Sequence, residues 1–138
     1  MTVWAFDLDG TLIGSVRSDR RRPGALDLLL ELGALGVTCV LWSAGGAQYA
    51  ERKAREHGIA DRFEAFYDKA ARGPDGRYAV GHFEPAHVPD VFVDDSPNDV
   101  SPDVYVVAVA QFFGGNDADT ALLHVLDALE GHLAEAAG

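Results

Sequence analysis

Cysteine is nearly absent from this sequence, and long apolar runs are absent altogether. The one cysteine, Cys39, lies in the apolar run 37–41, which favours a buried thiol over a nucleophile and excludes a disulfide within the chain. No segment approaches the roughly 20 apolar residues that a membrane-spanning helix needs. The first residues also lack the basic and apolar parts of a secretion signal. We therefore expect a soluble, cytoplasmic protein without a membrane partner.

Positive charge is scarce as well. The chain has 11 basic against 22 acidic residues and a formal net charge of −11, which disfavours binding to a nucleic-acid backbone. The five histidines show no spacing typical of zinc ligands. Of the two lysines, Lys53 lies in a helical pattern where a solvated face explains it, which leaves Lys69 as the candidate for a functional role.

Length and apolar content indicate one domain over residues 1–138. With 48% apolar residues, the chain can bury one core but is too short for two domains. Short β-rich runs occur at 3–6, 37–42, 63–67, 91–93 and 104–110, and helical patterns at 24–35, 46–57 and 119–134. This alternation predicts an α/β fold, a three-layer Rossmann-like parallel sheet of about five strands.

Two segments interrupt the alternation. Residues 10–22 form a polar excursion before the first helix, and residues 70–90 precede the fourth strand with a turn signal at 73–76, which predicts a short hairpin. Only residues 97–102 separate the last two strands, which leaves room for about one helical turn. Neither segment is long enough for another domain.

Polar residues follow the predicted strands where their carboxyl ends should meet, which is where open parallel sheets bind ligands. Asp7 and Asp9 follow the first strand, Ser43 ends the second, and Lys69 follows the third. The fourth strand is followed by three acids, Asp94, Asp95 and Asp99. We therefore expect carboxylates, a hydroxyl and an ammonium on one rim.

The residue types on this rim suit phosphoryl transfer. Crowded carboxylates need a cation, and an all-oxygen ligand set suits Mg²⁺. Asp7 can attack phosphorus to form an aspartyl phosphate, while Asp9 protonates the leaving oxygen and later activates water. Fixed donors would stabilise the transferred group, and we place the phosphate contacts at Leu8, Thr11, Ser43, Ala44 and Lys69. The predicted function is Mg²⁺-dependent hydrolysis of phosphomonoesters.

Other interpretations remain open at this point. Asp-Gly is also a common turn signal, and Ser43 can cap the helix that follows it. A phosphotransferase would use the same intermediate. A signalling phosphoacceptor domain also combines Asp, hydroxyl and Lys, but it places its lysine after the fifth strand, where this chain has none. A non-catalytic interaction domain could also keep the same fold.

The motifs resemble those of the haloacid dehalogenase superfamily. Residues 7–11 are similar to its first motif, 41–43 to its second, Lys69 to its third and 93–99 to its fourth. The resemblance implies that the first strand lies between the second and fourth. It also implies that Mg²⁺ binds the Asp7 carboxylate, the Asp9 carbonyl and Asp95, with Asp99 as an outer acid and Asp94 either a ligand or the partner of Lys69.

The same resemblance bears on the substrate. An acid at position 9 favours phosphoryl chemistry over carbon–halogen cleavage, and segments 10–22 and 70–90 are too short for the superfamily's cap domains. A capless site admits a phosphorylated small molecule or a phosphoprotein, or is covered by a second subunit in a homo-oligomer. Residues 10–22 correspond to the superfamily's flap and hold Arg17, Arg20, Arg21 and Arg22. These arginines could recruit an anionic substrate or simply form a solvated loop.

Overall fold

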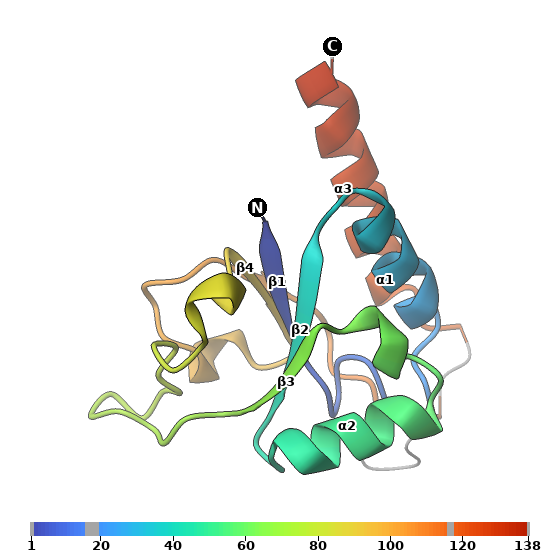
Figure 1. The fold of residues 1–138 in the computed structure, drawn as a ribbon. Coiled ribbons are helices and arrows are strands. Elements are labelled where there is room, and N and C mark those ends of the chain that lie inside the picture. The colour runs from blue at the N-terminus through green and yellow to red at the C-terminus, as the bar shows by residue number, and fades with distance from the viewer. Residues whose placement is uncertain (1, 16–19, 116–117, 138) are drawn as a thin grey trace.

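The computed structural model describes residues 2–15, 20–115 and 118–137. Within them, all strands belong to one parallel sheet with the order β3-β2-β1-β4-β5 (Figure 1). The strands are β1 (Val3–Asp7), β2 (Thr38–Ser43), β3 (Ala65–Asp68), β4 (Val91–Asp94) and β5 (Val106–Ala108). The first strand therefore lies at the centre, between the second and the fourth, as the resemblance implied. The predicted Rossmann-like α/β fold is confirmed.

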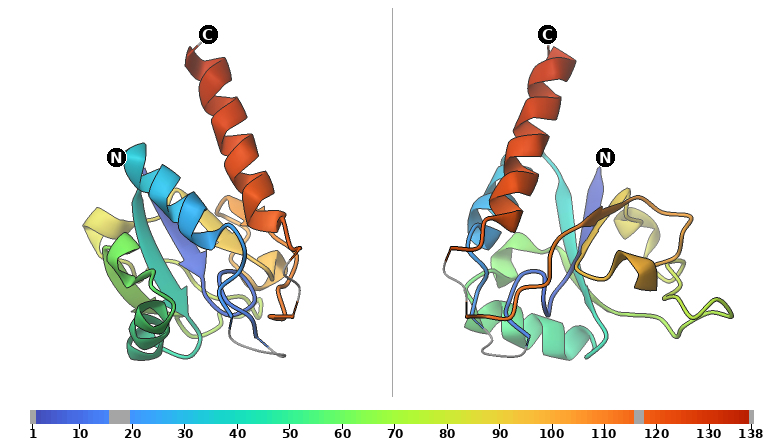
Figure 2. Two further views of the ribbon diagram at one scale, coloured as in Figure 1. Left: turned by 90° about the vertical axis from the view of Figure 1, so that its right-hand side faces the viewer. Right: turned by 180° about the vertical axis from the view of Figure 1, so that it is seen from behind.

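The α-helices begin and end within a few residues of their predicted positions. They are α1 (Ala25–Ala34), α2 (Ala47–Glu56) and α3 (Ala121–Ala137). Gly58 follows α2 with a φ of 72°, which is open to glycine and strained for other residues, so this glycine ends the helix. Both views in Figure 2 show α3 extending well beyond the sheet. No helix in the described part of the chain combines the length and the apolarity needed to cross a membrane.

The two faces of the sheet are covered differently. On one face, Trp4, Phe6 and Leu41 pack against apolar residues of all three α-helices, among them Leu28, Ala54 and Leu122. On the other face, the strand residues pack with Phe83 and Val100, which lie in loops. Among the described residues, the second covering layer is therefore an irregular segment, because the links from β3 to β4 and from β4 to β5 contain no α-helix. Both faces of the sheet are thus covered, one by helices and the other by this irregular segment.

The inserted segment 70–90 forms a small hairpin followed by a 3₁₀ turn, η2 (Pro85–His87). Arg72 and Tyr78 make a single antiparallel bridge around the predicted turn. Within this turn the Gly76 amide donates to the Gly73 carbonyl at 3.0 Å. Tyr78 also bridges Val100, just after the 3₁₀ turn η3 (Pro97–Asp99). The insertion is thus bound to the loop after β4, and no cap domain is formed by it.

Candidate active site

Asp7 is the last residue of the central strand, and its carboxylate is held from two sides. The side chain is buried, with 6% of the residue exposed. The Thr11 hydroxyl donates to Asp7 Oδ2 at 3.0 Å, and Lys69 Nζ lies 3.0 Å from Asp7 Oδ1. Because one donor contacts each oxygen, the carboxylate has a defined orientation at the end of β1.

The loop after Asp7 is a tight turn that only a glycine permits. The Leu8 carbonyl accepts the amides of Thr11 and Leu12 at 3.2 and 2.9 Å. Gly10 has a φ of 83°, and a Cβ atom at this position would collide with the Asp95 carboxylate. The Asp-Gly pair is therefore a turn signal and part of the site at once, because the absent side chain lets the fourth-motif acid approach the loop.

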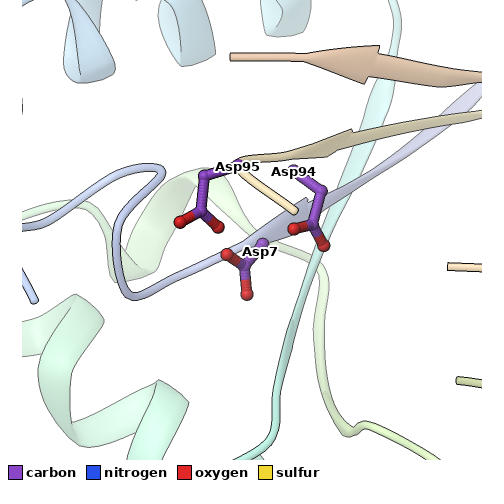
Figure 3. A group of neighbouring side chains, drawn as sticks. All are labelled: Asp7, Asp94 and Asp95. Carbon is purple, nitrogen blue, oxygen red and sulfur yellow. The ribbon is translucent and has the colours of Figure 1, made fainter. Parts of the chain in front are cut away.

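Three carboxylates form an acidic cluster at this edge of the sheet. One oxygen each of Asp7, Asp94 and Asp95 lies within 4.8 Å of the others (Figure 3). Burial, followed by the negative charge of Asp7, raises the pKa of Asp94 to about 6. Burial and a hydrogen bond with Asp7 raise the pKa of Asp95 to about 7. The cluster is thus short of positive charge, and its all-oxygen donor set fits Mg²⁺.

Lys69 places a positive charge beside the acidic cluster. Its ammonium lies 3.0 Å from Asp7 Oδ1 and 3.4 Å from Asp94 Oδ2, so Asp94 does hold Lys69 as considered from the sequence. It also lies 4.9 and 5.0 Å from the ring centroids of Trp42 and Tyr78. Burial lowers the pKa of Lys69, but the charges of Asp7 and Asp94 outweigh this and raise it overall. The group therefore stays a cation.

Asp9 lies beside the cluster and has a partner that the sequence did not reveal. The Tyr49 hydroxyl, in the first turn of α2, donates to Asp9 Oδ1 at 2.9 Å. Burial raises the pKa of Asp9 in spite of this hydrogen bond. A raised pKa suits a carboxyl group that must give up a proton near neutral pH. Tyr49 could have been suspected from the sequence only because it is a tyrosine near the start of the helix that follows Ser43.

Ser43 ends β2 as predicted, but it does not cap α2. Its hydroxyl accepts the Gly45 amide at 3.1 Å and leaves its own hydrogen for another acceptor. The Ala47 amide at the start of α2 instead donates to Asp68 Oδ1 at 2.6 Å. Ala44 is exposed in the intervening turn. The capping interpretation of Ser43 is therefore wrong, and Asp68 has that role.

Asp99 lies outside the acidic cluster, so the structure does not bring this predicted outer acid together with Asp7, Asp94 and Asp95. The 3₁₀ turn η3 carries it toward the inserted hairpin, where its carbonyl accepts the Tyr78 amide at 2.7 Å. Its carboxylate lies 3.5 Å from Arg72 Nη1 with 48% of the side chain exposed. Asp99 thus attaches the hairpin to the fourth motif.

Leu8 and Thr11 are fully buried, which changes how they could serve a phosphate. The Thr11 hydroxyl donates to Asp7 and accepts the Asp95 amide at 3.1 Å, so it links two members of the acidic cluster. The Leu8 side chain packs in the core, so only its backbone could face a ligand. The phosphate contacts predicted for Leu8 and Thr11 therefore fall to the backbone of this loop and stay a prediction.

The arginines of segment 10–22 do not act as one group. Arg17 lies outside the described residues. Arg21 donates to the His57 carbonyl at 2.8 Å. Arg22 is 1% exposed and paired with Asp119, so neither a solvated loop nor recruitment of substrate describes it.

Comparison with known proteins agrees with this geometry. A family model described as NLI interacting factor-like phosphatase matches residues 3–137. The matched range contains every rim residue from Asp7 to Asp95. A comparison with curated proteins gave no match.

Proposed function

Because the chain belongs to the NLI interacting factor-like phosphatases, a capless family of the haloacid dehalogenase superfamily that hydrolyses phosphate esters, we propose a specific mechanism for it. It cleaves phosphomonoesters through an aspartyl phosphate on Asp7, with Mg²⁺ as cofactor. The observation that carries this proposal is the Asp7 carboxylate, placed between Lys69 and Thr11 within the acidic cluster.

The first step transfers the phosphoryl group to the protein. An oxygen of Asp7 forms a bond to phosphorus while the bond from phosphorus to the leaving oxygen breaks, and the Asp9 carboxyl gives that oxygen its proton. The Tyr49 hydroxyl, 2.9 Å from Asp9 Oδ1, holds the acid in one orientation. The raised pKa of Asp9 favours the protonated form that this step requires.

The second step returns the site to its starting state. Asp9, now ionised, takes a proton from a water molecule whose oxygen bonds to phosphorus, and the bond between phosphorus and Asp7 breaks. Lys69 and the hydroxyl of Ser43 face the negative charge that spreads over the phosphoryl oxygens in both steps. The ammonium of Lys69 is buried, so its charge acts at close range with little screening by water.

The acidic cluster would hold the cofactor. Asp7 and Asp95 are the carboxylates that we assign as Mg²⁺ ligands, together with the Asp9 backbone carbonyl, because Asp94 already pairs with Lys69. When bound, Mg²⁺ offsets the charge of the substrate phosphate and of the carboxylates. No lid is built from segment 70–90, so the substrate class includes phosphate groups on proteins as well as on small molecules.

The mechanism is tested by hydrolysis of 4-nitrophenyl phosphate with and without Mg²⁺. Asp7→Asn is expected to abolish turnover, and Asp9→Asn to reduce it by at least about a hundredfold. Asp27→Asn, an exposed acid of α1, is the matched control and should keep full activity. Turnover that survives Asp7→Asn would contradict the mechanism. Formation of methyl phosphate in preference to inorganic phosphate when methanol is added would identify a phosphotransferase instead.

A further inference from the structure

Arg22 is a buried cation whose every donor has an acceptor. Nε and Nη2 contact the two carboxylate oxygens of Asp119 at 2.7 and 3.0 Å, in a bidentate pair. Nη2 also donates to the Ala110 carbonyl at 2.6 Å. Nη1 donates to the carbonyls of Gly10 and Thr11 at 3.4 and 3.2 Å. The five N–H groups of the guanidinium are thereby all used.

These contacts join the first loop to two points near the other end of the chain. Gly10 and Thr11 belong to the loop after the proposed nucleophile, Ala110 follows β5, and Asp119 precedes α3. The Phe112 amide adds a hydrogen bond to the Gly10 carbonyl at 2.8 Å, and the Phe112 ring lies 5.4 Å from the Arg22 guanidinium. The loop after Asp7 is therefore held from outside by Arg22 and by the segment after β5.

The position of this loop decides the position of two acids. The Thr11 hydroxyl donates to Asp7 and accepts the Asp95 amide, and Gly10 packs against the Asp95 carboxylate. A shift of the Gly10 and Thr11 carbonyls would move the Thr11 hydroxyl and loosen both acids. Catalysis that depends on aligned groups loses about a hundredfold in rate when they move by about 1 Å.

We propose that Arg22 and Asp119 are positioning residues, a buried ion pair that fixes the Gly10–Thr11 loop and thereby aligns Asp7 with Asp95. The proposal rests on the proposed function of Asp7. Arginine is specifically required, because a lysine has three donors on a single nitrogen and cannot contact Asp119 and three carbonyls in one plane. A buried pair of this kind is a poor means of gaining stability alone.

A purely structural role is the competing explanation. The Ala121 amide donates to Asp119 Oδ1 at 3.2 Å, so Asp119 also caps α3, and its loss could simply destabilise the protein. The variants Arg22→Lys and Asp119→Asn separate the two roles, because asparagine keeps an oxygen for the Ala121 amide while losing the charge. Asp119→Asn also keeps the test available if Arg22→Lys does not fold.

Steady-state kinetics with 4-nitrophenyl phosphate and Mg²⁺ form the first part of the test. The assays are run well below the melting temperature of each variant. Each variant is expected to lower kcat by about ten- to a hundredfold, with KM changed by less than about twofold. The double variant should lose no more than about the larger single loss, because the residues act as one unit. Arg55→Gln, which breaks an exposed pair with Glu51, is the matched control and should be unaffected.

Hydrogen exchange is the second part, because it reports on the loop without depending on activity. Both variants should speed exchange of the amides of residues 10–13, with the amides of β2 unchanged. A lowered melting temperature with wild-type kcat and wild-type exchange at residues 10–13 would overturn the proposal. Activity that survives Asp7→Asn would instead refute the mechanism, while the exchange result would still show whether the ion pair fixes the loop.

Discussion

Lys69 and Asp7 face each other across the end of β1, with 3.0 Å between Nζ and Oδ1. The lysine comes from the segment after β3, at the edge of the sheet, and its backbone amide donates to the Ser43 carbonyl at 3.0 Å. Its side chain therefore crosses β2 to reach the central strand. The pair brings the first and third motifs together with a defined geometry.

Removal of the Lys69 charge should impair catalysis more than folding. In Lys69→Gln, the phosphoryl group loses a buried cation, and we expect kcat to fall by about 10²–10³-fold. Arg55→Gln, in an exposed pair with Glu51, is the control and should retain wild-type kcat. Wild-type turnover in Lys69→Gln would show that the buried cation has no role in the reaction.

The acidic cluster should give the metal-free protein an unusual dependence on pH. The pKa values of Asp94 and Asp95 are raised from 3.8 to about 6 and about 7. The folded state therefore binds more protons than the unfolded state, and this contribution to stability is lost as pH rises from about 4 to about 7. Asp95→Asn should consequently raise the melting temperature of the metal-free protein more near pH 8 than near pH 5.

Mg²⁺ should offset the loss of stability at high pH, because it binds the ionised carboxylates. Its addition should raise the melting temperature of the wild type more near pH 8 than near pH 5, and Asp95→Asn should weaken that effect. Asp99 lies outside the cluster, so Asp99→Asn should gain as much melting temperature from Mg²⁺ as the wild type does. An equal gain from Mg²⁺ in Asp95→Asn and in the wild type would remove Asp95 from the ligand set.

Gly10 should tolerate no side chain. Gly10 has a positive φ, and a Cβ atom there would collide with the Asp95 carboxylate. Gly36 has a φ of 77°, and a Cβ atom there would meet open space. Gly10→Ala and Gly36→Ala both carry the backbone cost of about 1–2 kcal/mol, so their difference in unfolding free energy isolates the collision. We expect Gly10→Ala to be the less stable and to lose nearly all activity. Equal stability and retained turnover would show that the loop can move away.

Tyr49 should matter most for poor leaving groups. In Tyr49→Phe, the Asp9 carboxyl loses the hydroxyl at 2.9 Å that orients it, and we expect kcat/KM for an alkyl phosphate to fall by about tenfold. The loss with 4-nitrophenyl phosphate should be smaller, because that leaving group needs little protonation. Tyr105→Phe, at an exposed tyrosine, is the control. Equal losses with both substrates would argue against an effect on the proton transfer from Asp9.

The strands and the rim could be predicted because they follow from local patterns. Buried parallel strands are continuous apolar runs, and their carboxyl ends converge, so Asp7, Ser43 and Asp94 could be placed on one edge. The covering of the second face could not be predicted, because the apolar residues in the segment after β3 follow neither a helical nor a strand periodicity. Its core contacts come from single side chains such as Phe83.

Contacts between distant segments were also beyond prediction. The pairing of Arg22 with Asp119 spans 97 residues and depends on how α3 and the segment after β5 dock beside the first loop. Four arginines in one short segment looked alike in sequence, yet Arg22 is buried. The position of Asp99 was equally hidden, since a single 3₁₀ turn decides whether it faces the cluster or the hairpin.

The central claim is that Asp7 becomes phosphorylated during turnover. Asp9→Asn should slow hydrolysis of the intermediate, so acid quenching of this variant with 4-nitrophenyl phosphate and Mg²⁺, followed by peptide mass spectrometry, measures the claim directly. A phosphate group on the peptide that contains Asp7, removed by hydroxylamine and absent when Asp7→Asn is added to the variant, is the expected result. A phosphate on another residue would contradict the account.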